Sequence, residues 1–236
     1  MTWEPMLSGG IIAAGEGARL RQAGWMVPKP MVPVAGVPLI ESTIRNFVAA
    51  GIRRLSIIVN EQEMECAEWV RARFSALDLR LIVKTTASSL ESFCEVTREA
   101  AARGRMLVST VDAWCRPEDF ARFAKTARRR PSEATVLAVT PLVEDEKPLG
   151  AVLDPDGRVL ALGGAAPTLV TAGMYLVSER ARRLEPPAQL GRLREYLQWL
   201  LETGEPMYGE VIETVVDVDR AEDIALAEAL AARHTQ

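Results

Sequence analysis

Two glycines and two cations near the start of the chain form the pattern best suited to chemistry. Gly15 and Gly17 follow an apolar run, and Arg19 and Lys29 come after them. Glycines let backbone N–H groups approach a phosphate closely, an arginine adds a planar fork of donors, and a lysine adds a compact charge. Because prolines flank Lys29 on both sides, the backbone that carries it is stiff. The pattern predicts a clamp for a triphosphate.

Other interpretations of the glycine pair are less well supported. A lone G-x-G after a strand is most often an ordinary tight turn. The dinucleotide-binding fingerprint requires a third glycine where this chain has Leu20. The phosphate loop of the ATPases ends in G-K-[ST], which this segment lacks. A phosphate-binding loop of a different type therefore remains.

Three blocks of sequence occur in the same order in one known family. Residues 13–20 read AAGEGARL, residues 28–30 read PKP and residues 36–40 read GVPLI. This pattern resembles the nucleotidyltransferase family of the NDP-sugar pyrophosphorylases and MobA-like NTP transferases. The resemblance implies transfer of NMP from an NTP to a small phosphorylated metabolite, such as a sugar 1-phosphate, with release of pyrophosphate. It also implies catalytic roles for Arg19 and Lys29, and nucleotide contacts from Ala13, Ala14, Gly15, Glu16 and Gly17.

A reaction between two polyanions calls for a metal ion, and Mg²⁺ prefers carboxylates and phosphate oxygens. Open α/β sheets bind ligands beyond the carboxyl ends of their strands, and Asp112 follows such a strand at residues 106–109. The family usually carries an aspartate at the matching place. The alternative, that Asp112 caps the next helix, is weaker because Pro117 is a better helix start.

The second metal ligand is expected near the end of the chain. Residues 215–223, VVDVDRAED, resemble the closing D-x-D-x-x-E-D element of the family. Asp217 and Asp219 alternate by two in an extended segment, so both point to one side and either could join Asp112. Asp219 could equally cap the last helix, with Glu222 at the capping-box position.

Other site residues follow from weaker likenesses. In the sugar pyrophosphorylases a segment matching residues 84–92 contacts base and ribose, which implies nucleotide contacts from Thr86 and Ser88. Ser88 could instead be a simple helix N-cap. On the acceptor side, the resemblance implies contacts from Gly150, Thr171 and Gly173. The Glu-Lys pair by which sugar-specific members grip the sugar phosphate is absent, since residues 162–166 read LGGAA.

The elements that must position these residues alternate between two periodicities. Apolar runs of strand length occur at residues 10–13, 55–59, 79–83, 106–109 and 134–140. Helical patterns occupy residues 39–50, 64–75, 88–102 and 117–129. A hairpin at 150–153 and 158–162, strands at 170–177 and 211–218, and helices at 190–202 and 222–232 follow. We expect an α/β fold: a single Rossmann-like domain over residues 1–236, with a mixed, mostly parallel sheet between helices. The resemblance implies the nucleotide-diphospho-sugar transferase type.

Composition excludes several other classes of protein. With a net charge of −4 and 48% hydrophobic residues, the chain has no broad nucleic-acid surface. No apolar stretch is long enough to span a membrane. Three scattered cysteines without metal-ligand spacing, and no signal peptide, predict a reducing cytoplasm. A homo-oligomer is compatible with this composition.

Two rival functions remain open at this stage. A metal-dependent glycosyltransferase also uses a nucleotide-binding sheet with aspartates, although it does not need the cations at positions 19 and 29. A nucleotide-binding module without catalysis would accommodate the altered acceptor segment. The sequence selects neither the base of the NTP nor the acceptor.

Overall fold

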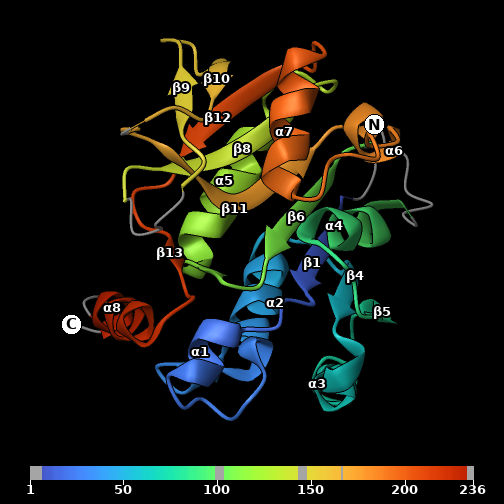
Figure 1. The fold of residues 1–236 in the computed structure, drawn as a ribbon, viewed down its shortest axis with the longest axis vertical. Helices are drawn as coiled ribbons and strands as arrows, with labels where there is room; N and C mark the ends of the chain where they lie inside the picture. The colour runs from blue at the N-terminus through green and yellow to red at the C-terminus, as the bar shows by residue number, and fades with distance from the viewer. Residues whose placement is uncertain (1–6, 99–103, 143–147, 166, 233–236) are drawn as a thin grey trace.

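The computed structural model describes residues 7–98, 104–142, 148–165 and 167–232. Its centre is a seven-stranded sheet in the order β12-β8-β11-β6-β1-β4-β5 (Figure 1). All neighbouring strands are parallel except β11, which is antiparallel to both β6 and β8. The predicted mixed, mostly parallel sheet is therefore confirmed. The strands are β1 (Ser8–Ala13), β4 (Arg54–Val59), β5 (Asp78–Val83), β6 (Met106–Thr110), β8 (Thr135–Thr140), β11 (Val170–Val177) and β12 (Met207–Val211).

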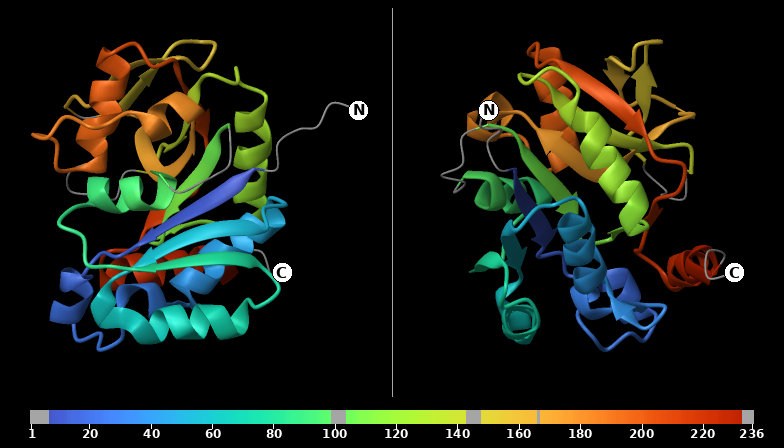
Figure 2. Two further views of the ribbon diagram at one scale, coloured as in Figure 1. Left: turned by 90° about the vertical axis from the view of Figure 1, so that its right-hand side faces the viewer. Right: turned by 180° about the vertical axis from the view of Figure 1, so that it is seen from behind.

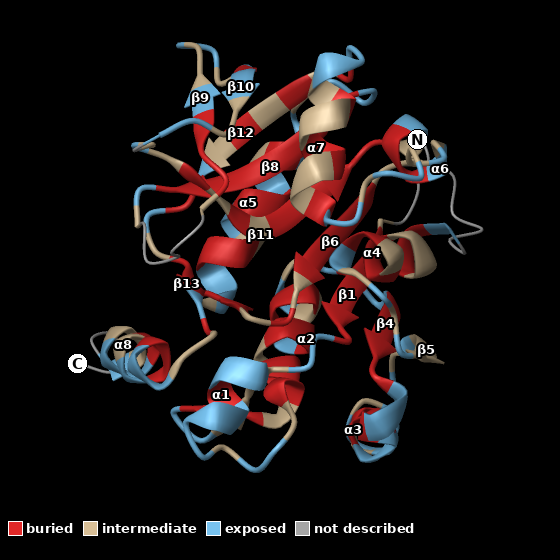
Figure 3. Ribbon diagram, viewed as in Figure 1, coloured by how far each residue is buried: buried red, intermediate tan, exposed pale blue. Residues whose placement is uncertain are grey.

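Helices cover both faces of this sheet (Figure 2). Side chains alternate along a strand, so Ile11 lies in one core with Phe47 and Phe120, whereas Ile12 lies in the other with Phe93. Burial of both faces explains why the strands read as continuous apolar runs (Figure 3). Five helices contribute to the first core: the short α1 (Ala18–Gln22), α2 (Leu39–Ala49), α3 (Met64–Arg73), α5 (Pro117–Arg128) and α8 (Ala221–Ala232). Three contribute to the second: α4 (Ser89–Arg98), α6 (Glu179–Arg183) and α7 (Leu193–Glu202).

Short elements complete the described chain. The predicted hairpin is confirmed as β9 (Ala151–Leu153) and β10 (Val159–Leu162), joined by a turn in which Asp154 Oδ1 accepts backbone hydrogen bonds. Two further antiparallel pairs join β2 (Pro33–Val34) to β3 (Val37–Pro38) and β7 (Ala113–Trp114) to β13 (Val216–Asp217). The remaining elements are the 3₁₀ turns η1 (Lys29–Met31) and η2 (Glu61–Glu63).

The prediction of a last strand over residues 211–218 is wrong. The last strand of the sheet is β12, which pairs in parallel with β8 and ends at Val211. Beyond it the chain leaves the sheet, and only the two residues of β13 pair with another strand. The apolar residues that motivated the prediction are buried by packing in the first core: Ile212, Val215, Val216 and Val218.

Smaller differences concern helix ends. Helix α7 begins at Leu193, three residues later than predicted, and the short helices α1 and α6 were not predicted. The helix predicted over 88–102 is described from Ser89 to Arg98, and its remaining residues lie outside the described part of the chain. Position 166 of the LGGAA segment also lies outside it.

Candidate active site

The loop that contains Gly15 and Gly17, here called the glycine loop, lies beside Asp112 at the edge of the sheet formed by the carboxyl ends of the parallel strands. Strands β1 and β6 are parallel neighbours, with Ile12 opposite Thr110, so their carboxyl ends lie together. The glycine loop follows β1, and Asp112 follows β6 by two residues. Backbone pairing continues past the strand, because the Val111 N–H donates to the Ile12 carbonyl at 3.0 Å. The two predicted halves of the site are thus adjacent, at the edge where such sheets bind ligands.

The glycine loop connects buried backbone to an exposed turn. Ala13 and Ala14 are buried, whereas Gly15 and Glu16 are exposed. Gly17 has a φ of 60° and precedes α1, so its backbone is left-handed. A Cβ on Gly17 would lie 2.8 Å from the Cβ of Lys29, while one on Gly15 would meet nothing within 4 Å. The loop therefore needs glycine at position 17 to approach Lys29, and is open at position 15.

Lys29 connects the segment that carries the glycine loop to Asp112 and Asp219. The side chain is only 7% exposed, and its Nζ donates to Asp112 Oδ2 at 2.6 Å and to Asp219 Oδ1. Arg19 donates to the other oxygen of Asp219 at 2.8 Å. Burial would lower the pKa of Lys29, but the neighbouring carboxylates outweigh burial and raise it. The ammonium is therefore charged at neutral pH.

Three carboxylates converge beside this ammonium. The β7–β13 pair sets Asp217 opposite Ala113, next to Asp112, and the Val218 N–H donates to the Asp112 carbonyl at 3.0 Å. One oxygen each from Asp112, Asp217 and Asp219 lie within 4.8 Å of one another. Opposite ligands of Mg²⁺ lie roughly 4.2 Å apart, twice the usual Mg–O distance. The hard oxygen donors and their spacing fit a divalent cation.

Two of these carboxylates, those of Asp112 and Asp219, form ion pairs with cationic side chains. Burial would raise the pKa of Asp112, but the charge and hydrogen bond of Lys29 outweigh burial and lower it. Asp219 accepts from both Arg19 and Lys29. The alternative role of Asp219 as a helix cap finds no support in these contacts. Instead, Asp223 reaches back from the first turn of α8 and accepts from the N–H groups of Asp219 and Arg220.

Thr86 and Ser88 lie between β5 and α4, beyond the carboxyl end of a strand at the same edge. Ser88 Oγ accepts from the Glu91 N–H at 3.1 Å, which is the geometry of a helix N-cap. Thr86 Oγ1 and Ser92 Oγ are 2.6 Å apart. These hydrogen bonds of Thr86 and Ser88 lie within residues 86–92.

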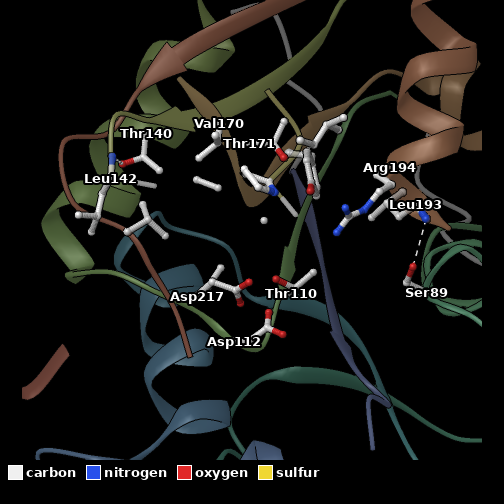
Figure 4. Close-up of a pocket in the computed structure, with 17 residues that line it drawn as sticks. Ser89, Thr110, Asp112, Thr140, Leu142, Val170, Thr171, Leu193, Arg194 and Asp217 are labelled. Atoms are coloured by element: carbon white, nitrogen blue, oxygen red, sulfur yellow. Dashed lines mark hydrogen bonds between the residues drawn. The ribbon is translucent and has the colours of Figure 1, made fainter. Parts of the chain in front are cut away.

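A cavity of about 210 Å³ opens beside Asp112 and Asp217 (Figure 4). It extends from Asp112 and Asp217 toward the amino end of β11, which lies at this edge because β11 runs antiparallel to its neighbours. The predicted acceptor residues Thr171 and Gly173 both line it. Gly150 is not among its described lining residues; a Cβ there would meet Pro167 at 2.6 Å and the Gly163 carbonyl at 2.7 Å.

A family model for the MobA-like NTP transferase domain matches residues 9–161, which include the glycine loop, Lys29 and Asp112. The chain belongs to this family. Its sequence is 27% identical over 226 residues to the bifunctional IPC transferase and DIPP synthase of Rubrobacter xylanophilus, covering 92% of this chain and 50% of that protein. It is 30% identical over 196 residues to a glucose-1-phosphate thymidylyltransferase of an Actinoplanes species, covering 78% of this chain and 63% of the relative.

The solved structures agree with the fold of an NTP transferase domain. The inositol-1-phosphate CTP transferase from T. maritima superposes with a TM-score of 0.82 at 17% identity, covering 97% of this chain and 96% of that one. The chain spans only about half to two thirds of the length of the two curated relatives. In the described part of the chain, no helix has the length and apolar character needed to cross a bilayer.

Sequence reasoning missed several polar residues that line the cavity, among them Tyr175 and Arg194. Tyr175 lines the cavity together with Thr171 and Gly173 of the same strand, although the strand pairing shifts register between Thr171 and Tyr175. Its place on the predicted strand over residues 170–177, close to both predicted acceptor residues, could have revealed it. Arg194 enters the cavity from α7, where nothing in the local sequence separates it from an ordinary surface arginine.

Proposed function

We propose that this protein is a nucleotidyltransferase that transfers NMP from an NTP to a small phosphorylated acceptor and releases pyrophosphate. An oxygen of the acceptor phosphate attacks the α-phosphorus, the bond from that phosphorus to the bridging oxygen breaks, and pyrophosphate leaves. Family membership supports this reaction, since the relatives are named as transferases of nucleotides to phosphorylated small molecules. The assignment of roles to particular residues rests on the geometry of this chain.

The observation that carries the proposal is the meeting of Arg19 and Lys29 with the acids around Asp112. A site for two polyanions needs fixed positive charge at the phosphates and ligands for a metal ion close by. Here the cations bond directly to the candidate metal ligands, at the edge of the sheet where such folds bind ligands. An ordinary tight turn with a surface lysine would not bury the ammonium as Lys29 is buried here.

Each part of the clamp has a distinct task in this proposal. The backbone of residues 13–17 and the guanidinium of Arg19 hold the β- and γ-phosphates. Lys29 neutralises the charge that develops around the α-phosphate. Asp112, with Asp217 or Asp219, holds Mg²⁺, which when bound withdraws charge from substrate phosphate oxygens. Positioning and electrostatics supply the acceleration, because phosphoryl chemistry asks little covalent work of the protein.

The substrates are assigned to the spaces on either side of the acids. Thr86 and Ser88 face the base and ribose, and Thr171 and Gly173 face the acceptor in the cavity. Gly150 acts behind this wall, where it allows close packing. Relatives are named for thymidylyl transfer and for CTP, so pyrimidine nucleotides are the first candidates. Glucose 1-phosphate and inositol 1-phosphate, which two relatives are named for, are the first acceptors to test.

A pyrophosphate-release screen tests the proposal. The four common NTPs and dTTP are each combined with Mg²⁺ and a panel containing hexose 1-phosphates, inositol 1-phosphate, phosphocholine and a phosphonate. The expected result is acceptor-dependent pyrophosphate release with at least one pair. Release of nucleoside diphosphate would instead indicate a glycosyltransferase. Nucleotide binding without turnover across the panel would indicate a module without catalysis.

A further inference from the structure

The cavity beside the acids carries opposite charges on two walls. Asp112 and Asp217 lie at one end, and the side chain of Arg194 extends from α7 toward the same space (Figure 4). Hydroxyl groups of Thr110, Thr140, Thr171 and Tyr175 also line this cavity. Arg194 is the sole cation among the described residues that line this cavity. A ligand that fills the space therefore contacts both acids and a guanidinium.

The first turn of α7 holds Arg194 on a fixed base. Leu193 and Tyr196, on either side of Arg194, are buried in the second core. The Leu193 N–H donates to Ser89 Oγ at 3.1 Å, and the Tyr196 hydroxyl donates to the Ala181 carbonyl at 2.6 Å. Glu195 accepts from the N–H of Arg192 at 3.0 Å and so caps the helix start. A cation on such an element needs little ordering when it binds an anion.

The Tyr175 hydroxyl is close enough to Asp112, Asp217 and Arg194 for the charges of all three to affect its pKa. Burial raises the pKa of this phenol, and the negative charges of Asp112 and Asp217 raise it further. A hydrogen bond with Thr171 and the charge of Arg194 act in the opposite direction without cancelling the rise. The Tyr175 hydroxyl therefore stays protonated and is available as a donor on the floor of the cavity.

From this arrangement we infer that Arg194 binds the phosphate of the acceptor and makes a phosphate or phosphonate group the required feature of that substrate. This inference rests on the proposed function. An acceptor phosphate next to Asp112 and Asp217 brings further negative charge to this end of the cavity, and a guanidinium on the other wall offsets that charge. A guanidinium offers two parallel donors that match phosphate oxygens. The rest of the acceptor then lies toward Thr140, Leu142 and Val170.

The test compares three variants with the acceptor that gives the fastest turnover in the screen. For Arg194→Gln we expect the KM of the acceptor to rise about 10- to 100-fold, since a charge-assisted hydrogen bond is lost, while the KM of the NTP changes little. Arg194→Lys, which keeps the charge but loses the fork, should give an intermediate acceptor KM. Arg192→Gln is the matched control, because this arginine is exposed one residue before α7 and does not line the cavity.

A binding measurement separates this inference from the reaction itself. Inorganic phosphate should inhibit the wild type competitively against the acceptor, and should do so far more weakly with Arg194→Gln. An unchanged acceptor KM in Arg194→Gln, or an equal rise in the KM of the NTP, would overturn the inference while leaving the function intact. If no acceptor supports turnover, the function fails, and the thermal shift caused by phosphate in wild type and Arg194→Gln still tests Arg194. Equal thermal shifts in the two proteins would then overturn the assignment of Arg194 as a phosphate-binding residue.

Discussion

At the scale of single residues, Lys29 is the buried cation that bonds to both Asp112 and Asp219. Replacing it with Ala removes a buried positive charge beside the reacting phosphates, so we expect kcat to fall by roughly 10²-fold or more, as when one preorganised donor is lost. Steady-state kinetics and calorimetric NTP binding measure the two effects separately. Lys125→Ala, on the exposed side of α5, is the control. Unchanged turnover in Lys29→Ala would remove Lys29 from the mechanism.

Lys29 also shares its carboxylates with the metal ion assigned to this site. Its ammonium already bonds to Asp112 and Asp219, two of the three candidate ligands. Two unit charges 4 Å apart interact by about 4 kcal/mol at an effective dielectric constant of 20, so a nearby cation weakens metal binding. We therefore expect Lys29→Met to bind Mn²⁺ about tenfold more tightly than wild type without nucleotide, or roughly 1.4 kcal/mol.

Electron paramagnetic resonance of free Mn²⁺ measures this affinity without any turnover. Asp112→Asn in the same titration should bind the ion more weakly than wild type, because it loses an anionic ligand. Equal Mn²⁺ affinity in Lys29→Met and wild type would mean that the ion binds elsewhere than beside these carboxylates.

At the scale of elements, the two glycines of the glycine loop are expected to serve different purposes: Gly17 the stability of the fold, and Gly15 the binding of the NTP. Gly17→Ala forces a left-handed residue and a contact of 2.8 Å with Lys29, and should lower the free energy of unfolding by about 1–2 kcal/mol. Gly15→Ala meets no protein atom, so we expect little change in stability but a higher NTP KM, because its Cβ obstructs the loop N–H groups. Urea denaturation and kinetics on both variants check the contrast. A Gly15→Ala variant with normal NTP affinity would argue against a phosphate-binding loop.

Ser88 at the start of α4 has two assigned roles that a pair of variants can divide. Ser88→Ala removes the cap seen at the Glu91 N–H, and should cost about 1 kcal/mol of stability. Ser88→Asn keeps a capping oxygen and should restore most of that loss. If the NTP KM rises in Ser88→Asn as well as in Ser88→Ala, the hydroxyl contacts the nucleotide. If it is normal in Ser88→Asn, the residue serves the helix alone.

Elements were predictable wherever burial leaves a mark on the local sequence. Strands β1, β4 and β6 are buried on both faces, so their apolar runs stood out, and β11 was predicted with its observed ends. The segment after Val211 misled because its apolar side chains pack into the core without strand pairing. A run of apolar residues indicates that a segment is buried. When the run is short, it does not distinguish a buried loop from a buried strand.

At the scale of the whole molecule, the site joins distant parts of the chain, which limits what a sequence can reveal. Lys29 and Asp219 are 190 residues apart, yet they share a hydrogen bond. The clamp and the acids were predictable because each belongs to a recognisable block. Arg194 belongs to none, and only the packing of α7 against the sheet directs it into the cavity. The acceptor contact proposed for Arg194 thus depends on tertiary structure and not on a sequence motif.

The whole fold also makes a prediction for the three cysteines. Cys66 and Cys115 are buried in the first core, and Cys94 is partly exposed on α4. Burial raises the pKa of Cys66 to about 12 and raises that of Cys115 as well, so neither thiol forms much thiolate near pH 8, where a free cysteine is partly ionised. Burial also raises the pKa of Cys94, which should react slowly. We expect one thiol at most to react promptly with a disulfide reagent in the native protein, and all three in urea. Rapid reaction of two or three thiols in the native state would mean that the core around α3 and β7 is open, and that the support beneath Asp112 is not the one described here.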